Sequence, residues 1–401
     1  MQAAPAEPPV FKLPPRDPRL ADRLKDYPSD IFGERLYQSI ELMERYSIEL
    51  AIDLVRRLGV LGHLDDWRTS SELCQILGFR PRFCLALEWL LERLVETDCI
   101  DVRRAGGDRL YRLQQSPGMP DLRRFRQMTL NVDRANEPTL DLLDHAATVY
   151  PTIARGELTA EQVLFDPKGI DLWLGYFHND NPTYAVNNWA AALVATEHVS
   201  SLPRLRILEV GAGAGSGSEI LLQCLGKQQL LTSIERYSVT EPNAFFRRRA
   251  QRGLTSRFKD VPFEFTTLDL NHPWPAQIAP PHEFDLIYAV NVFHVSKDLL
   301  FSLKQAASML REGGWLVIGE CLRPRSNQPI YPELMFQNLD SFNDVQTDPD
   351  IRPRPGFLTP EQWRIAFERS EFAETAIAPD IEKIREFYPH FFTGAICGQK
   401  A

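Results

Sequence analysis

The sequence predicts an α/β protein, in which a doubly wound parallel sheet follows a mainly helical region. From residue 205 onward, short apolar segments alternate with helical stretches, a pattern typical of a parallel sheet covered by helices on both faces. The glycine-rich stretch EVGAGAGSG follows the first apolar segment, at the edge where open α/β sheets bind ligands. Before residue 200, apolar side chains instead recur at helical spacing.

Composition limits the classes of function. The 401 residues are 44% hydrophobic and 25% charged, as in globular proteins of two or three structural units. The net charge of -9 argues against nucleic acid as the main partner. Six dispersed cysteines without a CxxC pair indicate buried thiols in a reducing compartment. With no signal peptide and no apolar run of about 18 residues, we expect a cytoplasmic protein and no membrane contact.

Residues 1–30 are predicted to form an extended tail, because closely spaced prolines disfavour helix. Residues 31–118 read as helices followed by two short strands around 105–107, a winged-helix-like pattern. The presumed recognition helix, FCLALEWLLERL, offers mostly apolar and acidic side chains, which favours a lid or dimerisation domain over DNA binding. A homodimer is therefore a candidate assembly. Residues 119–200 are predicted to be a helical lid or connector.

Residues 201–401 carry the predicted sheet. Its strands are expected at 206–211, 237–242, 263–270, 284–293 and 314–322, with two further strands near 373–379 and 390–398. In the turn after the first strand, glycines allow the backbone to approach a ligand closely. Glu241 ends the second strand, where its carboxylate can accept ribose hydroxyls of a nucleoside. A GxGxG motif alone also suits a dinucleotide oxidoreductase or a purely structural turn.

The arrangement resembles the class I S-adenosylmethionine-dependent methyltransferases, whose first motif is E/DxGxGxG. Here the motif reads Glu209, Gly211, Gly213 and Gly215, and REGGWLVIGE is similar to the fifth motif of the family. The resemblance implies a Rossmann-like methyltransferase sheet that binds S-adenosyl-L-methionine and releases S-adenosyl-L-homocysteine. It also implies that Glu241, Asp269 and Asn291 bind this cofactor. The REGGW turn disfavours the oxidoreductase. The three arginines at 247–249 could form a phosphate-binding site, but we favour the interpretation that they lie on a solvent-exposed helix face.

His294 lies just past the fourth strand and Glu320 near the end of the fifth, 26 positions later. Because these strands are predicted to be parallel neighbours, the two side chains are expected to meet beside the cofactor. A carboxylate bound to one imidazole nitrogen fixes the tautomer and leaves the other nitrogen free to take a proton. The pair would then act as a general base.

The segments NVFHVSKDLL and LVIGE also resemble the C-methyltransferase domains of polyketide synthases, here in a chain expected to be free-standing. In that pattern, NVxHAxxxL precedes a strand that ends in Glu; Val295 replaces the alanine. The resemblance implies that His294 and Glu320 are a catalytic dyad for C-methylation. The implied substrate is a small polyketide-like molecule, keto acid or thioester, free or tethered to a carrier protein.

Several alternatives remain open. Tyr176, His178, Tyr184 and Asn187, together with Asn188, are candidate substrate contacts or ordinary surface residues. His294 would otherwise be a buried structural histidine, or a metal ligand with Asp298 and His178; no dense ligand cluster supports a metal. The same base would also serve O- or N-methylation. Other classes are a cyclase that retains the cofactor, and a regulator that binds S-adenosylmethionine and uses its winged helix on DNA.

Overall fold

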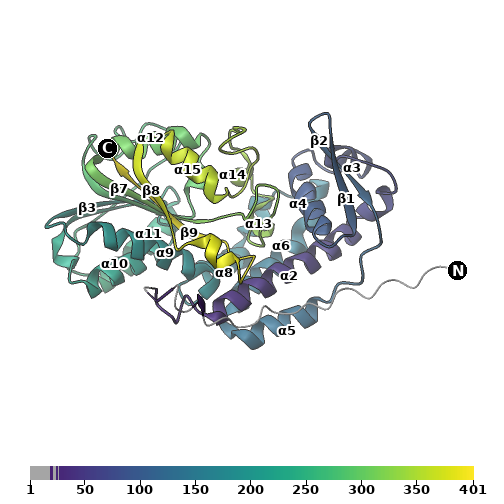
Figure 1. Cartoon of the computed structure of the whole chain (residues 1–401), viewed down its shortest axis with the longest axis horizontal. Helices are drawn as coiled ribbons and strands as arrows, with labels where there is room; N and C mark the ends of the chain where they lie inside the picture. The colour runs from purple at the N-terminus through teal and green to yellow at the C-terminus, as the bar shows by residue number, and fades with distance from the viewer. Residues whose placement is uncertain (1–18, 21–23, 26) are drawn as a thin grey trace.

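The computed structural model describes residues 19–20, 24–25 and 27–401. Most of the predicted proline-rich tail lies outside these residues. Within it, the described Leu20 and Leu24 are both 5% exposed and pack into the core. The chain then forms two lobes, one built on a sheet and one on helices (Figure 1).

A seven-stranded sheet in the order β5-β4-β3-β6-β7-β9-β8 forms the first lobe. The strands from β5 to β7 pair in parallel, and β9 runs antiparallel to both β7 and β8. The chain turns outward in both directions from β3, so the carboxyl ends of β3 and β6 meet at the switch point where such sheets bind ligands. The strands are β3 (Leu205–Val210), β4 (Ile234–Thr240), β5 (Phe263–Thr266), β6 (Phe284–Val290), β7 (Leu310–Cys321), β8 (Phe372–Ala378) and β9 (Thr393–Lys400).

Two strands are shorter than the sequence predicted. The strand expected at 284–293 ends at Val290, because Asn291 has a φ of 54° and turns the chain out of the extended conformation. The strand expected at 263–270 ends at Thr266, opposite Thr240, where its only partner β4 also ends. His294 therefore lies in a short 3-10 turn, η4 (Phe293–Val295), and not on a strand.

Helices cover both faces of the sheet, as the doubly wound pattern predicts. On one face lie α9 (Pro182–Val199), α10 (Ser216–Lys227) and α11 (Ala244–Arg257); on the other lie α12 (Leu299–Met309) and α15 (Pro360–Glu368) (Figure 1). Helix α9 falls within the predicted connector but packs directly on β6, β7 and β9. The connector thus contributes one layer of the sheet lobe.

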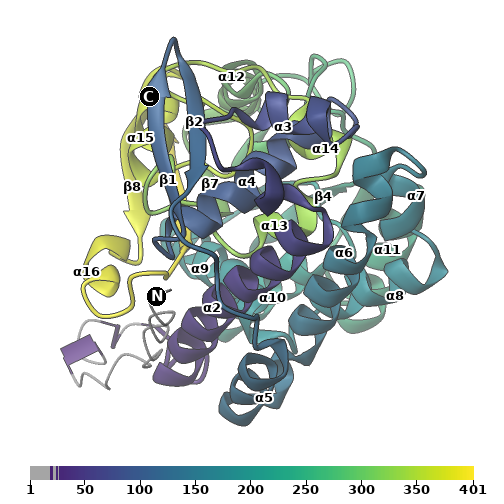
Figure 2. The ribbon, with the colours of Figure 1, turned by 90° about the vertical axis from the view of Figure 1, so that its right-hand side faces the viewer.

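The helical lobe contains the hairpin of the winged-helix-like pattern, in which β1 and β2 pair antiparallel (Figure 2). Its helices pack around the long α2, and the lobe shares one continuous apolar core with the sheet lobe. Its elements are α2 (Glu34–Arg57), η1 (Val60–His63), α3 (Ser70–Ile76), α4 (Phe83–Val95), β1 (Ile100–Ala105), β2 (Asp108–Leu113), α5 (Leu122–Val132), η2 (Arg134–Asn136), α6 (Glu137–Arg155), α7 (Ala160–Leu164) and α8 (Pro167–Tyr176).

Helix α4, the presumed recognition helix, is largely buried. The Trp89 side chain is inaccessible, and its indole Nε1–H donates to Glu333 at 3.1 Å. Glu92 receives two hydrogen bonds from Arg354, at 2.6 and 2.8 Å. A helix held in this way joins the two lobes. A DNA-recognition helix must instead expose its side chains so that they can enter the major groove.

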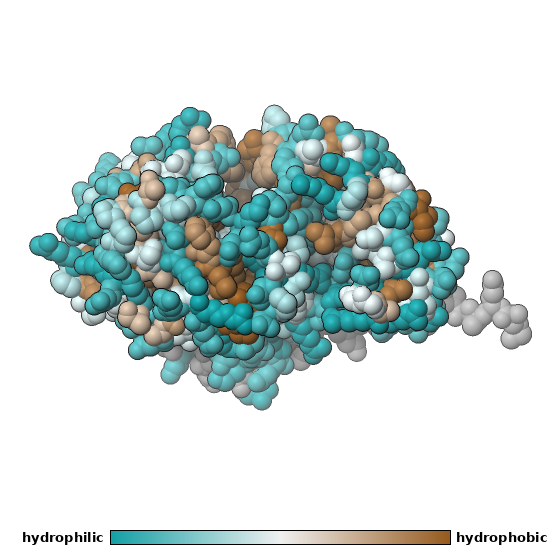
Figure 3. Space-filling model, turned by 90° about the horizontal axis from the view of Figure 1, so that it is seen from above, coloured by the Kyte–Doolittle hydropathy of each residue, from teal (hydrophilic) through white to brown (hydrophobic). Residues whose placement is uncertain are grey.

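The segment between β7 and α15 lies between the lobes and carries α13 (Glu333–Phe336) and α14 (Asp340–Asn343). Within the segment, buried Arg323 pairs with Glu333, and the backbone N–H of Tyr331 attaches the segment to α2 by donating to Glu44 at 2.9 Å. Seen from above, the surface is hollowed between the two lobes (Figure 3). Two further short elements, η3 (Leu231–Ser233) and α16 (Ile381–Arg385), belong to the sheet lobe. No helix in the described ranges has the length and apolar character needed to cross a membrane.

Candidate active site

The glycine-rich turn after β3 combines close packing with open space. Gly211 and Gly215 have φ values of +66° and +92°, and a Cβ on Gly211 would lie 2.6 Å from the Val292 side chain. Gly213 also has a positive φ, but a Cβ there would meet no atom within 4 Å. The turn therefore requires glycine for its conformation, and at Gly213 it borders space that a ligand can fill.

Glu241, at the end of β4, faces this turn. Its carboxylate accepts hydrogen bonds from the backbone N–H groups of Gly213, at 3.0 Å, and Asn243, at 2.8 Å. Burial raises the pKa of Glu241, while these two N–H groups oppose the shift. Each carboxylate oxygen retains a lone pair, so the group can still accept hydroxyl hydrogens.

Glu209 occupies a different position from Glu241. It is 2% exposed and lies beneath the turn, where it accepts hydrogen bonds from the Ser218 and Tyr237 hydroxyl groups. Burial raises the pKa of Glu209 to about 7. In this position the carboxyl group ties α10 to β4, and its direct contact with a cofactor stays a prediction.

Asp269 and Asn291 also lie at this edge of the sheet. The exposed Asp269 carboxylate accepts from the backbone of Asn271 at 2.9 Å and contacts the His272 ring at 2.9 Å; the Asn271 N–H lowers its pKa. Asn291 links β6 to β7, because its Oδ1 accepts from the Cys321 N–H at 3.2 Å. Their roles in cofactor binding stay predictions. Of the arginines at 247–249, Arg247 donates to the Glu241 carbonyl at 2.6 Å.

The structure brings His294 and Glu320 together. The ring Nδ1 lies 2.8 Å from Oε2 of Glu320, and the other carboxylate oxygen accepts from the backbone N–H groups of Val292 and His294, at 3.2 and 3.3 Å. Because an ionised carboxylate only accepts, Nδ1 is assigned the hydrogen and Nε2 is the basic nitrogen. Nε2 has no hydrogen-bond partner in the described part of the chain.

A partly open cavity of about 160 Å³, which we call the inner cavity, adjoins His294. The Phe357 and Phe342 rings lie 4.5 and 5.8 Å from the imidazole, centroid to centroid. Most of the remaining wall is aromatic or aliphatic, which limits the access of water to the imidazole ring. The aromatic residues of the wall are Tyr176, Phe177, Tyr184, Phe336, Phe342 and Phe357.

The predicted substrate contacts fall in different places. Tyr176 and Tyr184 line the inner cavity. Asn187 lies behind it, where its side chain donates to the Tyr184 carbonyl at 3.3 Å. His178 lies outside the cavity wall, and its half-exposed ring pairs with Asp180 at 3.2 Å. Asn188 is buried and donates to the Asn179 side chain at 2.8 Å. Contact of any of them with a substrate stays a prediction.

Several residues at this site were not singled out from the sequence. Phe336, Phe342 and Phe357 come from the irregular segment after β7, where no periodic pattern marks a buried face. Arg352, from the same segment, is 1% exposed and donates to the Ser296 carbonyl at 2.7 Å. Burial lowers the pKa of Arg352 to about 10, while the charges of Asp298 and Glu320 act in the opposite direction.

A metal site finds no support among the described residues, which contain no group of three or more His, Cys, Asp or Glu able to hold an ion. Asp298, a candidate ligand in the sequence, instead caps α12 by accepting from the Phe301 N–H at 3.0 Å. The six cysteines are free thiols, and all but Cys84 are buried.

Comparison with known proteins identifies the chemistry of this fold. Residues 208–316 match the family described as "Methyltransferase domain". The chain contains a methyltransferase domain. The match begins in β3 and ends in β7, so it spans the glycine-rich turn, Glu241 and His294. The predicted enzyme class, a methyltransferase, is confirmed.

The relatives extend the likeness beyond this domain. The polyketide synthase PksR of Bacillus subtilis (strain 168) is 28% identical over 247 residues, which cover 60% of this chain but 9% of that synthase. The crystal structure of the carbon methyltransferase CurJ superimposes with a TM-score of 0.77 at 23% identity, over 96% of both chains. The trans-methyltransferase CalH, in complex with SAH, has a TM-score of 0.60 at 18% identity, over 90% of both chains.

These likenesses confirm two predictions. Both the sheet lobe and the helical lobe have the fold of carbon methyltransferases, because the superposition on CurJ covers nearly the whole chain. In sequence the chain is related to polyketide synthases, and its fold is that of their C-methyltransferase domains. The chain spans about a tenth of the curated synthase PksR.

Proposed function

We propose that the methyltransferase transfers a methyl group from S-adenosyl-L-methionine to the acidic carbon of a β-ketoacyl thioester, with His294 as general base. The observation that carries this proposal is the orientation of the imidazole. Glu320 holds Nδ1 at 2.8 Å, and the unpaired Nε2 belongs to a ring that borders an aromatic cavity.

The residues of the turn after β3 fit the proposed cofactor. Gly213 borders open space beside the Glu241 carboxylate, which suits a nucleoside whose ribose hydroxyls donate hydrogen bonds. Asp269 and Asn291 complete the proposed cofactor contacts. When bound, S-adenosyl-L-methionine supplies a methyl group on a positively charged sulfur. The solved CalH structure, which contains SAH, supports this choice.

His294 performs the proton transfer in this proposal. Nε2 takes the proton from the carbon between the two carbonyl groups, and the electron pair of the broken C–H bond forms an enolate. The ring becomes an imidazolium, whose Nδ1–H donates to the negative Glu320 carboxylate. That charge stabilises the imidazolium, while the two backbone N–H groups on Oε1 keep the carboxylate in place.

The inner cavity favours a small, weakly polar acceptor. Its aromatic wall limits the access of water that would otherwise compete for the base. Tyr176 and Tyr184 are the proposed contacts for the reacting carbonyl groups, because their side chains line the same space as His294. His178 and Asn187 remain weaker candidates, since the first is outside the wall and the second is behind it.

The test is product analysis with a donor labelled with carbon-13 in its methyl group. The full chain is incubated with a short acetoacetyl thioester, an α-keto acid and a phenol, and each product is examined by mass spectrometry and NMR. We expect the label on the carbon between the two carbonyls of the thioester. Label on oxygen, or transfer only to the phenol, would overturn C-methylation and leave an O-methyltransferase.

A further inference from the structure

Arg352 is a buried arginine to which the proposed reaction gives no part. The residue is 1% exposed, and its Nη1 donates to the Ser296 carbonyl at 2.7 Å. The other two guanidinium nitrogens, Nε and Nη2, are also buried and have no hydrogen-bond partner among the described residues. A buried cation is costly to a fold, and a neutral donor would satisfy one carbonyl group equally well. The hydrogen bond to Ser296 therefore does not account for the positive charge of Arg352.

The segment between β7 and α15 holds Arg352 against the turn that carries His294. Ser296, whose carbonyl the guanidinium binds, follows His294 by two positions in this turn. The backbone N–H of Gln346 also donates to the Lys297 carbonyl, at 2.7 Å. Two contacts thus attach the segment to the chain immediately after the imidazole.

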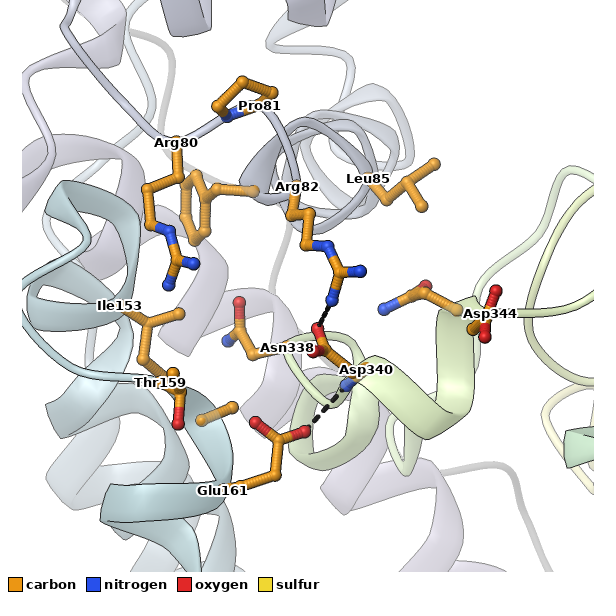
Figure 4. Close-up of a pocket in the computed structure, with 13 residues that line it drawn as sticks. Arg80, Pro81, Arg82, Leu85, Ile153, Thr159, Glu161, Asn338, Asp340 and Asp344 are labelled. Carbon is orange, nitrogen blue, oxygen red and sulfur yellow. Dashed lines mark hydrogen bonds and ion pairs between the residues drawn. The ribbon is translucent and has the colours of Figure 1, made fainter.

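The same segment is attached to the helical lobe. A second cavity, of about 220 Å³, lies where the segment faces residues 80–83 and the start of α7 (Figure 4). There the Asp340 carboxylate pairs with Arg82, and the Asp340 backbone N–H donates to Glu161 at 2.9 Å. Contacts with both the helical lobe and the turn after β6 therefore fix the position of Arg352.

Electrostatic interactions connect Arg352 to Glu320. Burial lowers the pKa of Arg352 to about 10, while the negative charges of Asp298 and Glu320 act in the opposite direction. The interaction is reciprocal, because a cation that Glu320 stabilises also favours the ionised form of Glu320. The same cation disfavours a second positive charge on the neighbouring imidazole of His294.

The titratable groups that line the inner cavity beside His294 carry no charge near neutral pH. Burial raises the pKa of each of them above its ordinary value. These groups are Tyr176, Tyr184 and Cys321. The charges that act on His294 and Glu320 therefore come from beyond the cavity wall.

Most charges in this neighbourhood are paired. The buried Glu333 pairs with Arg323, and the exposed Lys297 pairs with Asp344 at 3.2 Å. Arg352 makes no ion pair with any residue that the structure describes. No carboxylate in contact with Arg352 cancels its charge, so the charge acts on the groups around it.

We propose that Arg352 is a positioning residue for the dyad of His294 and Glu320, and that its fixed positive charge keeps the dyad able to accept a proton. This inference rests on the proposed function, because it matters for methyl transfer only if His294 takes the substrate proton. An imidazole bound to a buried carboxylate tends to hold a proton, and in that form it is no base. The two groups titrate as a coupled pair, and a nearby cation opposes protonation of either member. With Arg352 present, the dyad stays unprotonated to a lower pH.

The first experiment measures protonation of the dyad without methyl transfer. The full chain, labelled with carbon-13 in its histidine rings, is titrated by NMR, and His294→Ala identifies the signal of His294. We expect Arg352→Gln to move the midpoint to higher pH by about one pH unit, because glutamine keeps a donor for the Ser296 carbonyl but carries no charge. Arg352→Lys retains the charge and should keep the midpoint close to that of the wild type.

Arg385 provides the matched control. Burial lowers its pKa to about 10 as well, and its guanidinium donates to the carbonyl groups of Phe391 and Leu322, at 2.9 and 2.8 Å. The negative charge that acts on Arg385 is that of Glu382, with which it pairs at 3.1 Å. Arg385→Gln also removes a buried guanidinium, but it should leave the midpoint of the dyad unchanged.

An unshifted midpoint in Arg352→Gln, the same shift in Arg352→Lys, or an equal shift in Arg385→Gln would each overturn the proposal. Circular dichroism establishes that each variant is folded. Arg352→Met is a second neutral variant for the case that glutamine disrupts the fold, because apolar side chains often replace buried charges without loss of stability. It should move the midpoint in the same direction, and no shift in this variant would equally overturn the proposal.

The second experiment measures the kcat–pH profile with the acetoacetyl thioester. We expect the acidic limb of Arg352→Gln to lie at higher pH than that of the wild type, with kcat recovering at alkaline pH. A lower kcat at every pH with an unshifted midpoint and limb would show that Arg352 only supports the fold. A shifted NMR midpoint with an unshifted limb would confirm the effect of the charge on the dyad, but it would refute His294 as the general base.

Discussion

Two histidine–glutamate pairs in this molecule share the same hydrogen-bond pattern. Glu320 accepts from the backbone N–H of His294 at 3.3 Å and from its ring Nδ1 at 2.8 Å. Glu41 accepts from the backbone N–H of His390 at 3.0 Å and from its ring Nδ1 at 2.5 Å. Each glutamate therefore holds one ring nitrogen and the main chain of the same histidine.

The surroundings of the two rings differ. His294 is 6% exposed at its side chain and lines the inner cavity, whereas His390 is 29% exposed and lines none of the cavities described above. The second pair joins α2 to the chain before β9, across 349 residues of sequence. In either place, the carboxylate positions and polarises the imidazole. Only a cavity beside the second nitrogen makes the imidazole a candidate base.

Replacement of the two histidines should separate these roles most clearly. We expect His294→Ala to lower kcat about 10²- to 10⁴-fold, because a positioned general base contributes that much. His390→Ala should leave kcat near that of the wild type, since the ring does not face the inner cavity. Initial rates at saturating acceptor measure both, and the Kd for S-adenosyl-L-methionine should change little in His294→Ala. Normal turnover in His294→Ala would refute the general base.

Replacement of Glu320 should lower kcat less than replacement of His294. Glu320 accepts three hydrogen bonds, but glutamine has one oxygen, so its NH₂ group must face either the ring N–H or two backbone N–H groups. We expect Glu320→Gln to lower kcat about 10- to 100-fold, the effect of a lost bond to a charged group.

The pH dependence of kcat distinguishes positioning from a general defect. Without the negative charge of residue 320, the imidazolium is less stable, so the acidic limb of the kcat–pH profile should move to lower pH. Glu41→Gln is the matched control and should leave that limb unchanged. An unshifted limb in Glu320→Gln would contradict an electrostatic role for the carboxylate.

The free energy of unfolding should depend on the second pair, Glu41 and His390, although kcat should not. His390→Ala removes the partner of Glu41, whose side chain is 4% exposed, and should lower the free energy of unfolding by about 1–3 kcal/mol. A double-mutant cycle with Glu41→Gln, followed by urea denaturation, measures the coupling between the two side chains. Independent effects of the two substitutions would show that the hydrogen bond contributes nothing to the joining of the lobes.

The smallest expected effect is on the pH dependence of stability. Burial lowers the pKa of His390, but the hydrogen bond and charge of Glu41 outweigh it, so the folded-state pKa lies above the ordinary value. The stabilisation is then complete below the unfolded pKa of about 6.5 and is lost as the pH rises through the folded value. The stability difference between the wild type and His390→Gln should therefore be larger at pH 6 than at pH 9, by less than about 1.4 kcal/mol for each unit of pKa shift. An equal difference at both pH values would contradict the raised pKa.

Much of the sheet and of the proposed dyad was predictable because both depend on short-range patterns. Alternation of buried strands with helices marks the parallel sheet, and His294 and Glu320 each stand close to the end of such a strand. Neighbouring parallel strands place their carboxyl ends together, so the meeting of these two side chains follows from topology. The second pair was not predicted, since neither Glu41 nor His390 follows a strand of the parallel core.

The cavities illustrate what local pattern leaves out. Phe342 and Phe357 lie in an irregular segment, where neither a period of 2 nor a period of 3.6 marks the buried side. Asp269 was singled out from the resemblance alone, whereas its contacts with Asn271 and His272 in the adjacent turn emerged only from the structure.

By itself, the sequence determined where most strands lie, that the fourth and fifth strands are neighbours, and the glycine-rich turn, because these depend on side-chain periodicity and on backbone conformations that glycine allows. Tertiary structure alone decided which faces were buried. The burial of α4 and the aromatic wall around His294 both arise from contacts between segments far apart in the chain. Packing of that kind depends on shape and on the exclusion of water across the whole molecule, which no short stretch of residues encodes.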